Sequence, residues 1–196
     1  MVTKQQIRLG RADHGIKLTC EEFAEGIFEP PWHYERVEGR LVVMTPSGHD
    51  HVDAVEYFRD QFVAYKLAHP DRIANVVSEA WIVIDEQTDR IADLGVYIKS
   101  PRNKARIPEL APDIVVEVAS AGYTSLKRDY EEKREDYYRA GVKEYLIIDR
   151  IERRVTVFRR GRGKFTETIL TPEDFYSTTL LPKLKIPLNR SIGGGD

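Results

Sequence analysis

The chain has 196 residues, of which 41% are hydrophobic and 32% charged, and 30 basic against 32 acidic side chains give a formal net charge of -2. This profile is typical of a soluble globular protein, and the length suits one domain with a sizeable core, although two small lobes also fit it. The small net charge excludes a protein that coats nucleic acid through its overall charge, but it leaves room for a local basic groove.

The sequence predicts neither a membrane-spanning helix nor a secretory signal. No apolar run approaches the roughly 18 to 20 residues that a bilayer-spanning helix needs, and the N-terminal segment 1–15 lacks the apolar stretch of a secretory signal. Cys20 is the single cysteine, so the chain can form neither an internal disulfide nor a cysteine-based zinc site. We therefore expect a cytoplasmic protein that does not associate with membranes.

The first predicted elements form an N-terminal helix and a hairpin. Residues 1–16 are polar and without a pattern, so we expect a loose lead-in there. A short helix follows, because Thr19 and Glu22 have the spacing of a capping box. The segment HYERVEGRLVVM, residues 33–44, predicts a β-hairpin that turns at Gly39.

An amphipathic helix is predicted over residues 49–70, where Pro70 ends the pattern. Its apolar positions, three to four residues apart, are Val52, Val55, Phe58, Phe62 and Tyr65. The later elements are strands at 75–77, 81–84, 91–98 and 114–118, a helix at 125–140, and strands at 145–148, 155–158 and 165–170. This order predicts one α/β domain with a mixed sheet over residues 17–190, followed by a flexible tail at 191–196.

Two carboxylates interrupt strands that are otherwise apolar. Glu117 stands within PDIVVEVAS and Asp93 within RIADLGVYI. An ionised carboxylate in a buried strand is costly unless a cation, a metal or several hydrogen-bond donors hold it. Both could converge on one Mg²⁺ or Mn²⁺, ions that take oxygen ligands and keep several waters. The alternative is structural: a strand-end Asp can cap a turn, and a strand Glu can pair with an Arg at a sheet edge.

Strict alternation along residues 91–98 predicts which face each of these strand positions occupies. It places Asp93 on one face, together with Gly95 and Tyr97, and Ala92 and Leu94 on the other.

Lys133 occupies an unexpected place on the helix after Glu117. The apolar stripe of that helix runs through Leu126, Tyr130, Tyr137 and Ala140, and Lys133 takes the missing position in the middle. A lysine on a buried face is costly unless its ammonium meets a carboxylate. The alternatives are a lysine that extends past the sheet edge, or an ordinary helix pair with Asp129, four residues earlier.

Asp, Glu and Lys around a divalent metal are a known arrangement for hydrolysing phosphodiesters. The metal polarises the phosphate and lowers the pKa of a bound water, while the lysine orients that water or stabilises charge on the phosphate oxygens. The sequence contains no Gly-rich phosphate loop, no HExxH motif and no Ser/His/Asp spacing that would favour another chemistry.

Three segments resemble the Uma-two family, restriction endonuclease-like proteins of the PD-(D/E)XK nuclease superfamily. The segments are YERVEGRLVVMTPSGHDH, ADLGVYI and PDIVVEVASAGYTSLKRDYEEKREDYYRAGVKEYLIID, and the most specific part is YYRAGVKEYLIID. The similarity covers roughly residues 19–188. It implies a restriction endonuclease-like fold, in which helices flank a mixed β-sheet core with an N-terminal helix and β-hairpin, and a phosphodiesterase-like site.

The resemblance assigns the two half-motifs residue by residue. Asp93 matches the Asp of the PD half-motif, although Ala92 stands where the family motif has proline. Glu117 matches the acidic residue of the second half-motif. Two positions later the chain has Ala119 where the basic superfamily pattern has lysine, and Lys133 on the following helix is the matching position.

The resemblance also suggests supporting residues. Glu35 matches a glutamate that would complete the metal shell, and His51 matches a histidine beside the first long helix, with His49 as a nearby competitor. Asp129 and Tyr137 fit the family spacing, either as support for the site or as packing residues.

Together these observations predict a Mg²⁺- or Mn²⁺-dependent endonuclease that acts on DNA. A homodimer is expected because cutting both strands favours two sites related by a twofold axis. The alternatives are a non-catalytic nucleic-acid-binding or interaction module with the same fold, and a metal-dependent hydrolase of a small phosphoester. A weaker DNA contact is predicted at a basic hairpin, which is otherwise a solvated surface, through Arg153, Arg154, Arg159 and Arg160.

Overall fold

The structure is a computed structural model and describes residues 6–100, 107–120 and 127–192. A mixed sheet of eight strands forms its centre, in the order β10-β9-β8-β7-β6-β3-β4, with β5 also paired to β6. These strands are β3 (His33–Val37), β4 (Arg40–Met44), β5 (Asn75–Asp85), β6 (Thr88–Tyr97), β7 (Ile114–Val118), β8 (Glu144–Asp149), β9 (Arg154–Arg160) and β10 (Phe165–Leu170). The β7–β8 pair is parallel and the other pairs are antiparallel.

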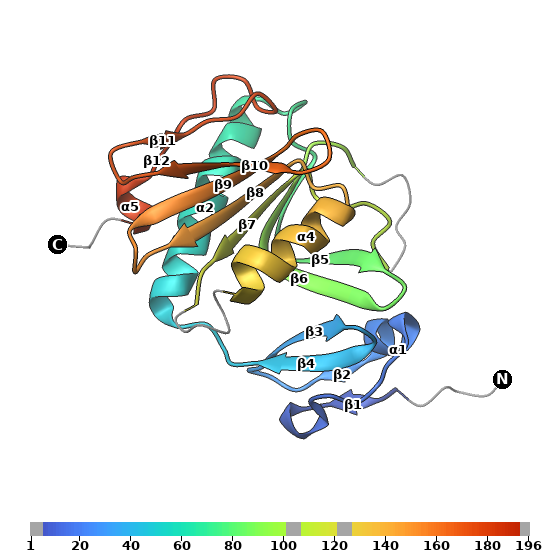
Figure 1. Cartoon of the computed structure of the whole chain (residues 1–196). Helices are drawn as coiled ribbons and strands as arrows, with labels where there is room; N and C mark the ends of the chain where they lie inside the picture. The colour runs from blue at the N-terminus through green and yellow to red at the C-terminus, as the bar shows by residue number, and fades with distance from the viewer. Residues whose placement is uncertain (1–5, 101–106, 121–126, 193–196) are drawn as a thin grey trace.

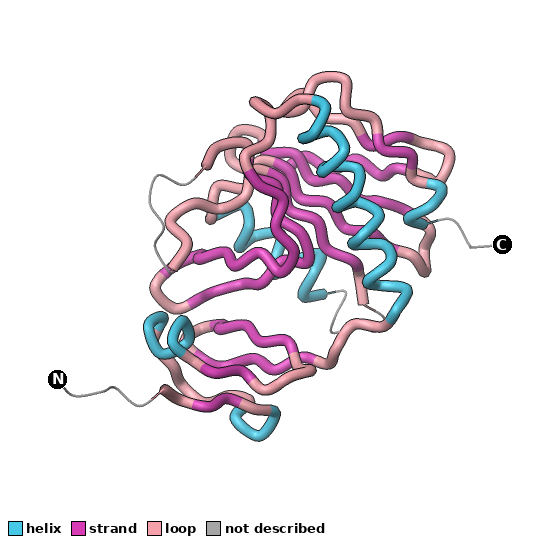
Figure 2. Tube along the Cα trace, turned by 180° about the vertical axis from the view of Figure 1, so that it is seen from behind, coloured by secondary structure: helices cyan, strands magenta, loops and turns pink. Residues whose placement is uncertain are grey.

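Helices cover both faces of this sheet (Figure 1). The long helix α2 (His49–Ala68) crosses one face, as Figure 2 shows from behind, and buries Phe58 and Phe62 completely. On the other face lies a helix whose described part consists of a π-helical turn, η2 (Arg128–Glu132), and α4 (Lys133–Arg139). Helices are therefore present at the predicted positions 49–70 and 127–140, whereas residues 125 and 126, the predicted start of the second helix, lie outside the described residues.

A small N-terminal layer packs against the β3–β4 hairpin. It contains β1 (Arg8–Leu9), η1 (Arg11–Asp13), α1 (Cys20–Glu25) and β2 (Ile27–Phe28). The capping box predicted at the start of α1 is present, because Thr19 Oγ1 accepts from the Glu22 N–H and the Glu22 carboxylate accepts from the Thr19 N–H. The hairpin turns through Glu38 and Gly39 with φ of 51° and 71°, as a two-residue turn of this kind requires.

The described residues of the predicted lead-in, 6–16, and of the predicted tail, 191–192, pack against the rest of the protein, whereas residues 1–5 and 193–196 lie outside the described residues. Leu9, within the expected lead-in, is 1% exposed and lies in a cluster with Phe23 and Leu41. At the other end, β11 (Phe175–Tyr176) pairs with β12 (Ile186–Pro187), and α5 (Asn189–Ile192) follows. Ile192, within the expected tail, is 1% exposed because it packs into the core that α2 covers. In both segments a single apolar side chain anchors a polar stretch to the core.

The sheet forks along β6, and this fork creates the space for a site. β6 pairs with β7 only between residues Leu94 and Val96, and it pairs with β3 through Asp89 and Arg36. The β3–β4 hairpin therefore leaves the main sheet at this point (Figure 1). Asp93 lies at the fork.

The strict alternation predicted along β6 is wrong at Asp93. Ala92 packs with the cluster on the α4 face, whereas Leu94 packs with the cluster on the α2 face. Opposite Asp93, Glu79 has φ of 52°, a left-handed conformation that non-glycine residues rarely adopt. The β5–β6 pairing skips Glu79 and Asp93. At this point the side chains of β6 exchange faces, so that Ala92 and Leu94 point to opposite sides of the sheet. The two predicted strands at 75–77 and 81–84 are one strand, β5, because pairing with β6 continues on both sides of Glu79.

Among the described residues, no helix is both long enough and apolar enough to cross a membrane.

Candidate active site

Lys133 forms the centre of a buried charged cluster beneath α4. Its Nζ lies 2.8 Å from Glu117 Oε1, 3.4 Å from Glu35 Oε1 and 3.9 Å from Asp129 Oδ1. The lysine is 3% exposed. Burial alone would lower the pKa of Lys133, but the three carboxylates outweigh that effect and raise the pKa, so the side chain remains an ammonium. The predicted contact between this helix and Glu117 is therefore present.

Glu117 is held between Lys133 and a tyrosine. The Tyr137 hydroxyl donates to Glu117 Oε1 at 2.5 Å, and the carboxylate is 3% exposed. Burial, opposed by Lys133 and reinforced by the charges of Asp93 and Asp129, raises the pKa of Glu117 to about 8. The site thus gathers more negative charge than its lysine offsets, and a bound cation would relieve this imbalance.

Asp93 lies beside Glu117 at the fork of the sheet. Its Oδ2 accepts a hydrogen bond of 2.8 Å from the Val118 N–H, a donor that lies beyond the short β6–β7 pairing. Burial alone would raise the pKa of Asp93, but contact with His51, the charge of Lys133 and this N–H lower it overall. The carboxylate is therefore ionised at neutral pH.

His51, from the first turn of α2, approaches the same carboxylate. Its Nε2 lies 3.0 Å from Asp93 Oδ2, but the approach does not meet hydrogen-bond geometry. That buried nitrogen consequently has no hydrogen-bond partner among the described residues. The structure thus places His51, a possible supporting residue, beside the Asp93 carboxylate.

Glu35 reaches the cluster from β3 and is 0% exposed. Its Oε2 accepts from Arg90 Nη1 at 2.9 Å, and its Oε1 accepts from the Ile91 N–H at 3.3 Å. Burial alone would raise the pKa of Glu35, but Lys133 and Arg90 lower it overall. Both oxygens are engaged, and Oε1 also lies 3.4 Å from Lys133 Nζ.

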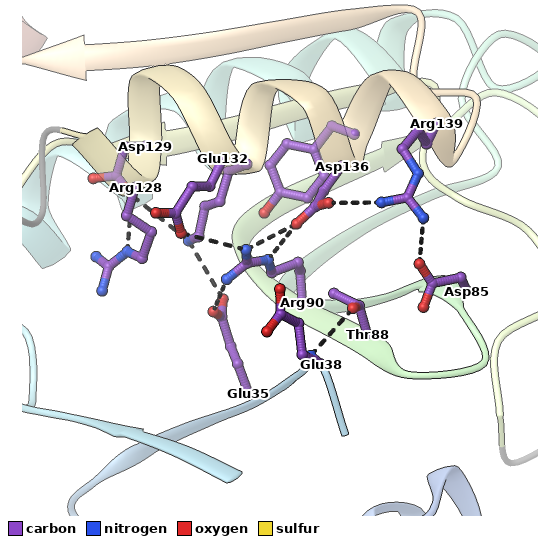
Figure 3. A network of polar contacts seen from close by, with 12 residues as sticks. Glu35, Glu38, Asp85, Thr88, Arg90, Arg128, Asp129, Glu132, Asp136 and Arg139 are labelled. Atoms are coloured by element: carbon purple, nitrogen blue, oxygen red, sulfur yellow. Dashed lines mark hydrogen bonds and ion pairs between the residues drawn. The ribbon is translucent and has the colours of Figure 1, made fainter. Parts of the chain in front are cut away.

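Arg90 connects this cluster to a wider network between β6 and α4 (Figure 3). Its Nε and Nη2 both lie 2.8 Å from Asp136 Oδ2, and Nη2 lies 3.9 Å from Glu132. The arginine is 2% exposed. Sequence reasoning missed Arg90, although the same signal was present: a charged residue in an apolar strand, three positions before Asp93.

A pocket of about 460 Å³ opens onto these residues. Five of the predicted residues line it, namely His51, Asp93, Glu117, Asp129 and Lys133, whereas Glu35 and Tyr137 lie behind it. Three further lining residues were missed or given little weight, namely His33, Glu79 and Arg128. The His33 Nδ1 atom lies 3.3 Å from Glu79 Oε1 at the rim.

The donor set fits a hard divalent cation. Within residues 6–100, 107–120 and 127–192, no group of three or more His, Cys, Asp or Glu side chains is arranged to hold a metal ion. Mg²⁺, however, needs only one or two carboxylates because it keeps several waters. Asp93 and Glu117 line one pocket, and the charge of Asp93 raises the pKa of Glu117. The Nε2 atom of His51, which makes no hydrogen bond among the described residues, lies 3.0 Å from Asp93.

The four arginines of the predicted basic hairpin lie elsewhere, and none lines this pocket. Arg159 Nε lies 3.6 Å from Glu144, and its Nη2 donates to the Ser177 carbonyl. Arg160 donates to the Val142 carbonyl and covers the Tyr138 ring at 3.8 Å. These two guanidiniums therefore serve the packing of β9. Arg154 lies 3.8 Å from the Asp149 carboxylate, and Arg153 is exposed in the turn before β9.

A protein family and a solved structure are similar to this chain. The family model Uma2, described as "Putative restriction endonuclease", matches residues 20–189. No match is found among curated proteins. A solved structure from Anabaena variabilis ATCC 29413, described as "a putative nuclease belonging to DUF820", is 19% identical, covers 89% of this chain and 97% of its own, and has a TM-score of 0.73. This likeness confirms the predicted restriction endonuclease-like fold.

Proposed function

The chain belongs to the Uma2 family, and from this premise we propose that it is a Mg²⁺- or Mn²⁺-dependent endonuclease that hydrolyses phosphodiester bonds of DNA. One observation carries the proposal: Asp93, Glu117 and Lys133, from two strands and a helix, meet at one pocket. A module that only binds nucleic acid has no use for a buried cluster with excess negative charge, whose desolvation is costly.

In this proposal Asp93 and Glu117 would hold the metal ion, and Glu35 would support them through Lys133. When bound, the ion would polarise the scissile phosphate and lower the pKa of a coordinated water. The Lys133 ammonium stays charged and lies 2.8 Å from Glu117, so it can orient the attacking water or stabilise charge on a phosphate oxygen. Tyr137 fixes the Glu117 carboxylate by donating to it.

Plasmid cleavage in Mg²⁺ tests the assignment. We expect Asp93→Asn and Lys133→Met to lose cleavage by at least about two orders of magnitude, because each removes a group that acts on the reacting atoms. The matched control is Lys185→Met, which removes the same charge from an exposed position and should cleave like the wild type. Cleavage that persists in both site variants would contradict the mechanism even if the protein is a nuclease.

A thermal melt tests the metal site independently of catalysis. Mg²⁺ or Mn²⁺ should raise the Tm of the wild type by mass action and should leave that of Glu117→Ala unchanged. A wild type that does not respond to either ion would exclude the proposed metal site. Sedimentation of the same samples tests the homodimer that we propose for cutting both strands.

A further inference from the structure

We propose that Arg128 is a substrate-binding residue that holds a non-bridging oxygen of a DNA phosphate in the pocket. This inference rests on the proposed function, because it assigns a contact to the substrate of that same site. Arg128 is the first residue of η2 and lines the pocket together with Asp93 and Glu117. Its side chain is 24% exposed, so it is accessible to a ligand there.

The guanidinium of Arg128 is held in place but only partly used. Its Nε lies 3.2 Å from Asp129 Oδ1, and its Nη1 donates to the Met44 sulfur at 3.2 Å. A thioether is a weak acceptor, which an arginine contacts where no better one is present. Within the part of the chain that the structure describes, Nη2 has no hydrogen-bond or ion-pair partner.

Arg90 provides the contrast within the same cluster. All three of its guanidinium nitrogens reach carboxylates, on Glu35 and Asp136. In Figure 3 the Arg128 guanidinium points away from this network, whereas that of Arg90 lies at its centre. Arg90 therefore uses all three guanidinium nitrogens within the protein, whereas Arg128 keeps Nη2 available for a ligand. A planar guanidinium with free donors suits the bidentate binding of a phosphate.

The charge balance of the pocket also calls for a second cation. Lys133 is already within 4 Å of three carboxylates, so little of its charge is available to an incoming phosphodiester. Among the described lining residues, the arginines and lysines are Arg128 and Lys133. A phosphate near Asp93 and Glu117 would meet repulsion that Arg128 can offset. The contacts of Arg128 with Asp129 and Met44 fix its side chain before the substrate arrives, which lowers the entropy cost of binding.

The π-helical turn is consistent with this role. The segment Arg128–Glu132 forms i→i+5 hydrogen bonds, a rare geometry that occurs mostly as single turns and frequently at functional sites. It lies immediately before Lys133, the lysine of the site.

The test is binding of a fluorescein-labelled DNA duplex by the full chain in EDTA, where no metal supports cleavage, as a function of salt. Arg128→Gln should weaken binding about tenfold and should reduce the slope of log K against log salt by about 0.9, the value for one phosphate contact. The matched control is Arg72→Gln, which loses the same charge beyond the far end of α2, about 30 Å from His49. A slope and affinity equal to those of Arg72→Gln would overturn the proposal, as would a wild type that does not bind the duplex.

Cleavage separates this proposal from the function on which it rests. If the wild type cuts no DNA in Mg²⁺ but Arg128→Gln still reduces the slope, the phosphate contact stands and the nuclease assignment fails. If the wild type cuts and Arg128→Gln cuts at the same rate with unchanged slope, the nuclease stands and the contact fails. Should the glutamine variant not fold, Arg128→Lys is the second variant, because it keeps the positive charge but removes the planar guanidinium. Its single-turnover rate should fall at an unchanged slope, and an unchanged rate would overturn the proposal.

Discussion

Replacing Arg90 with methionine tests whether the charged network supports the site. Methionine fills a similar length of side chain but carries no charge and no donors. In the wild type, Arg90 lies 2.9 Å from Glu35 and 2.8 Å from Asp136, and its side chain is 3% exposed. The substitution would leave Glu35, which is 0% exposed, with Lys133 at 3.4 Å as its remaining ion-pair partner among the described residues.

The expected loss of unfolding free energy is about 3 to 5 kcal/mol, the usual result of removing one partner from a buried ion pair. Most of this cost is the desolvation of a carboxylate that has lost its charge partner. For a chain of this length, each kcal/mol shifts the Tm by about 2 to 4 °C, so the melt should move by roughly 6 to 20 °C.

Urea denaturation of matched variants measures this effect. Arg139→Met is the control, because Arg139 also contacts Asp136, at 3.3 Å, but is 50% exposed. Its loss should cost less than about 1 kcal/mol. The double variant Arg90→Met/Glu35→Gln should recover part of the loss, because it leaves no unpaired charge on Glu35. Equal costs for the Arg90 and Arg139 variants, or strict additivity in the double variant, would refute the reasoning.

The same network predicts how stability depends on pH. The pKa of Glu35 in the folded protein lies below its ordinary value of 4.5. The stability that Glu35 contributes is therefore present above the ordinary pKa and is lost as the pH falls through the folded pKa. Arg90→Met should flatten this acidic limb of the stability curve, which denaturation at a series of pH values measures.

Other predictions concern the carboxylate site and the frame around it. Because the pKa of Glu117 is raised to about 8, the metal-free free energy of unfolding should fall as the pH rises from about 4.5 to 8. The Tm gain from Mg²⁺ should grow over the same range, because the ion would bind the ionised carboxylate. A Tm gain that does not depend on pH would contradict this. Tyr137→Phe removes a donor to that carboxylate, so the Mg²⁺ effect should move to higher pH, and an unmoved profile would exclude the role of the hydroxyl. Gly95→Ala should lower the free energy of unfolding, measured by urea denaturation, by about 1 to 3 kcal/mol, because the new Cβ would lie 2.6 Å from the Ala80 Cβ. An unchanged free energy of unfolding would show that the backbone of β5 shifts at little cost. Thr19→Ala should cost about 1 kcal/mol by the same assay, and no loss would mean that the capping box does not stabilise α1.

The helix side of the site follows from the sequence because periodicity determines it. Lys133 occupies a gap in an apolar stripe, and the spacing of four places Asp129 and Tyr137 on the same side of the helix. The structure places all three at Glu117 or beside it, through Lys133 and the Tyr137 hydroxyl. A costly residue on a buried face can be recognised before its partner is known.

The strand side could not be predicted in the same way. Alternation assumes an unbroken ladder, and β6 turns over at Asp93, opposite the left-handed Glu79. Nothing in the local sequence marks this, since neither residue is a glycine. The fork of the sheet, which exposes the Val118 N–H to Asp93, depends on which strands pair, and pairing is a long-range property.

The tolerance of Glu117 in an apolar strand has a consistent physical account. The cluster of Glu35, Asp93, Glu117, Asp129 and Asp136 faces three cations, Lys133, Arg90 and Arg128. Three carboxylates lie within 4 Å of Lys133, so the proposed divalent ion would offset negative charge, and the raised pKa lets Glu117 keep a proton near neutral pH. In the proposed site, a proton and the metal would compete for this one carboxylate, which Lys133 and Tyr137 contact. This competition is why the magnesium response and the pH response should change together when Tyr137 or Glu117 is replaced.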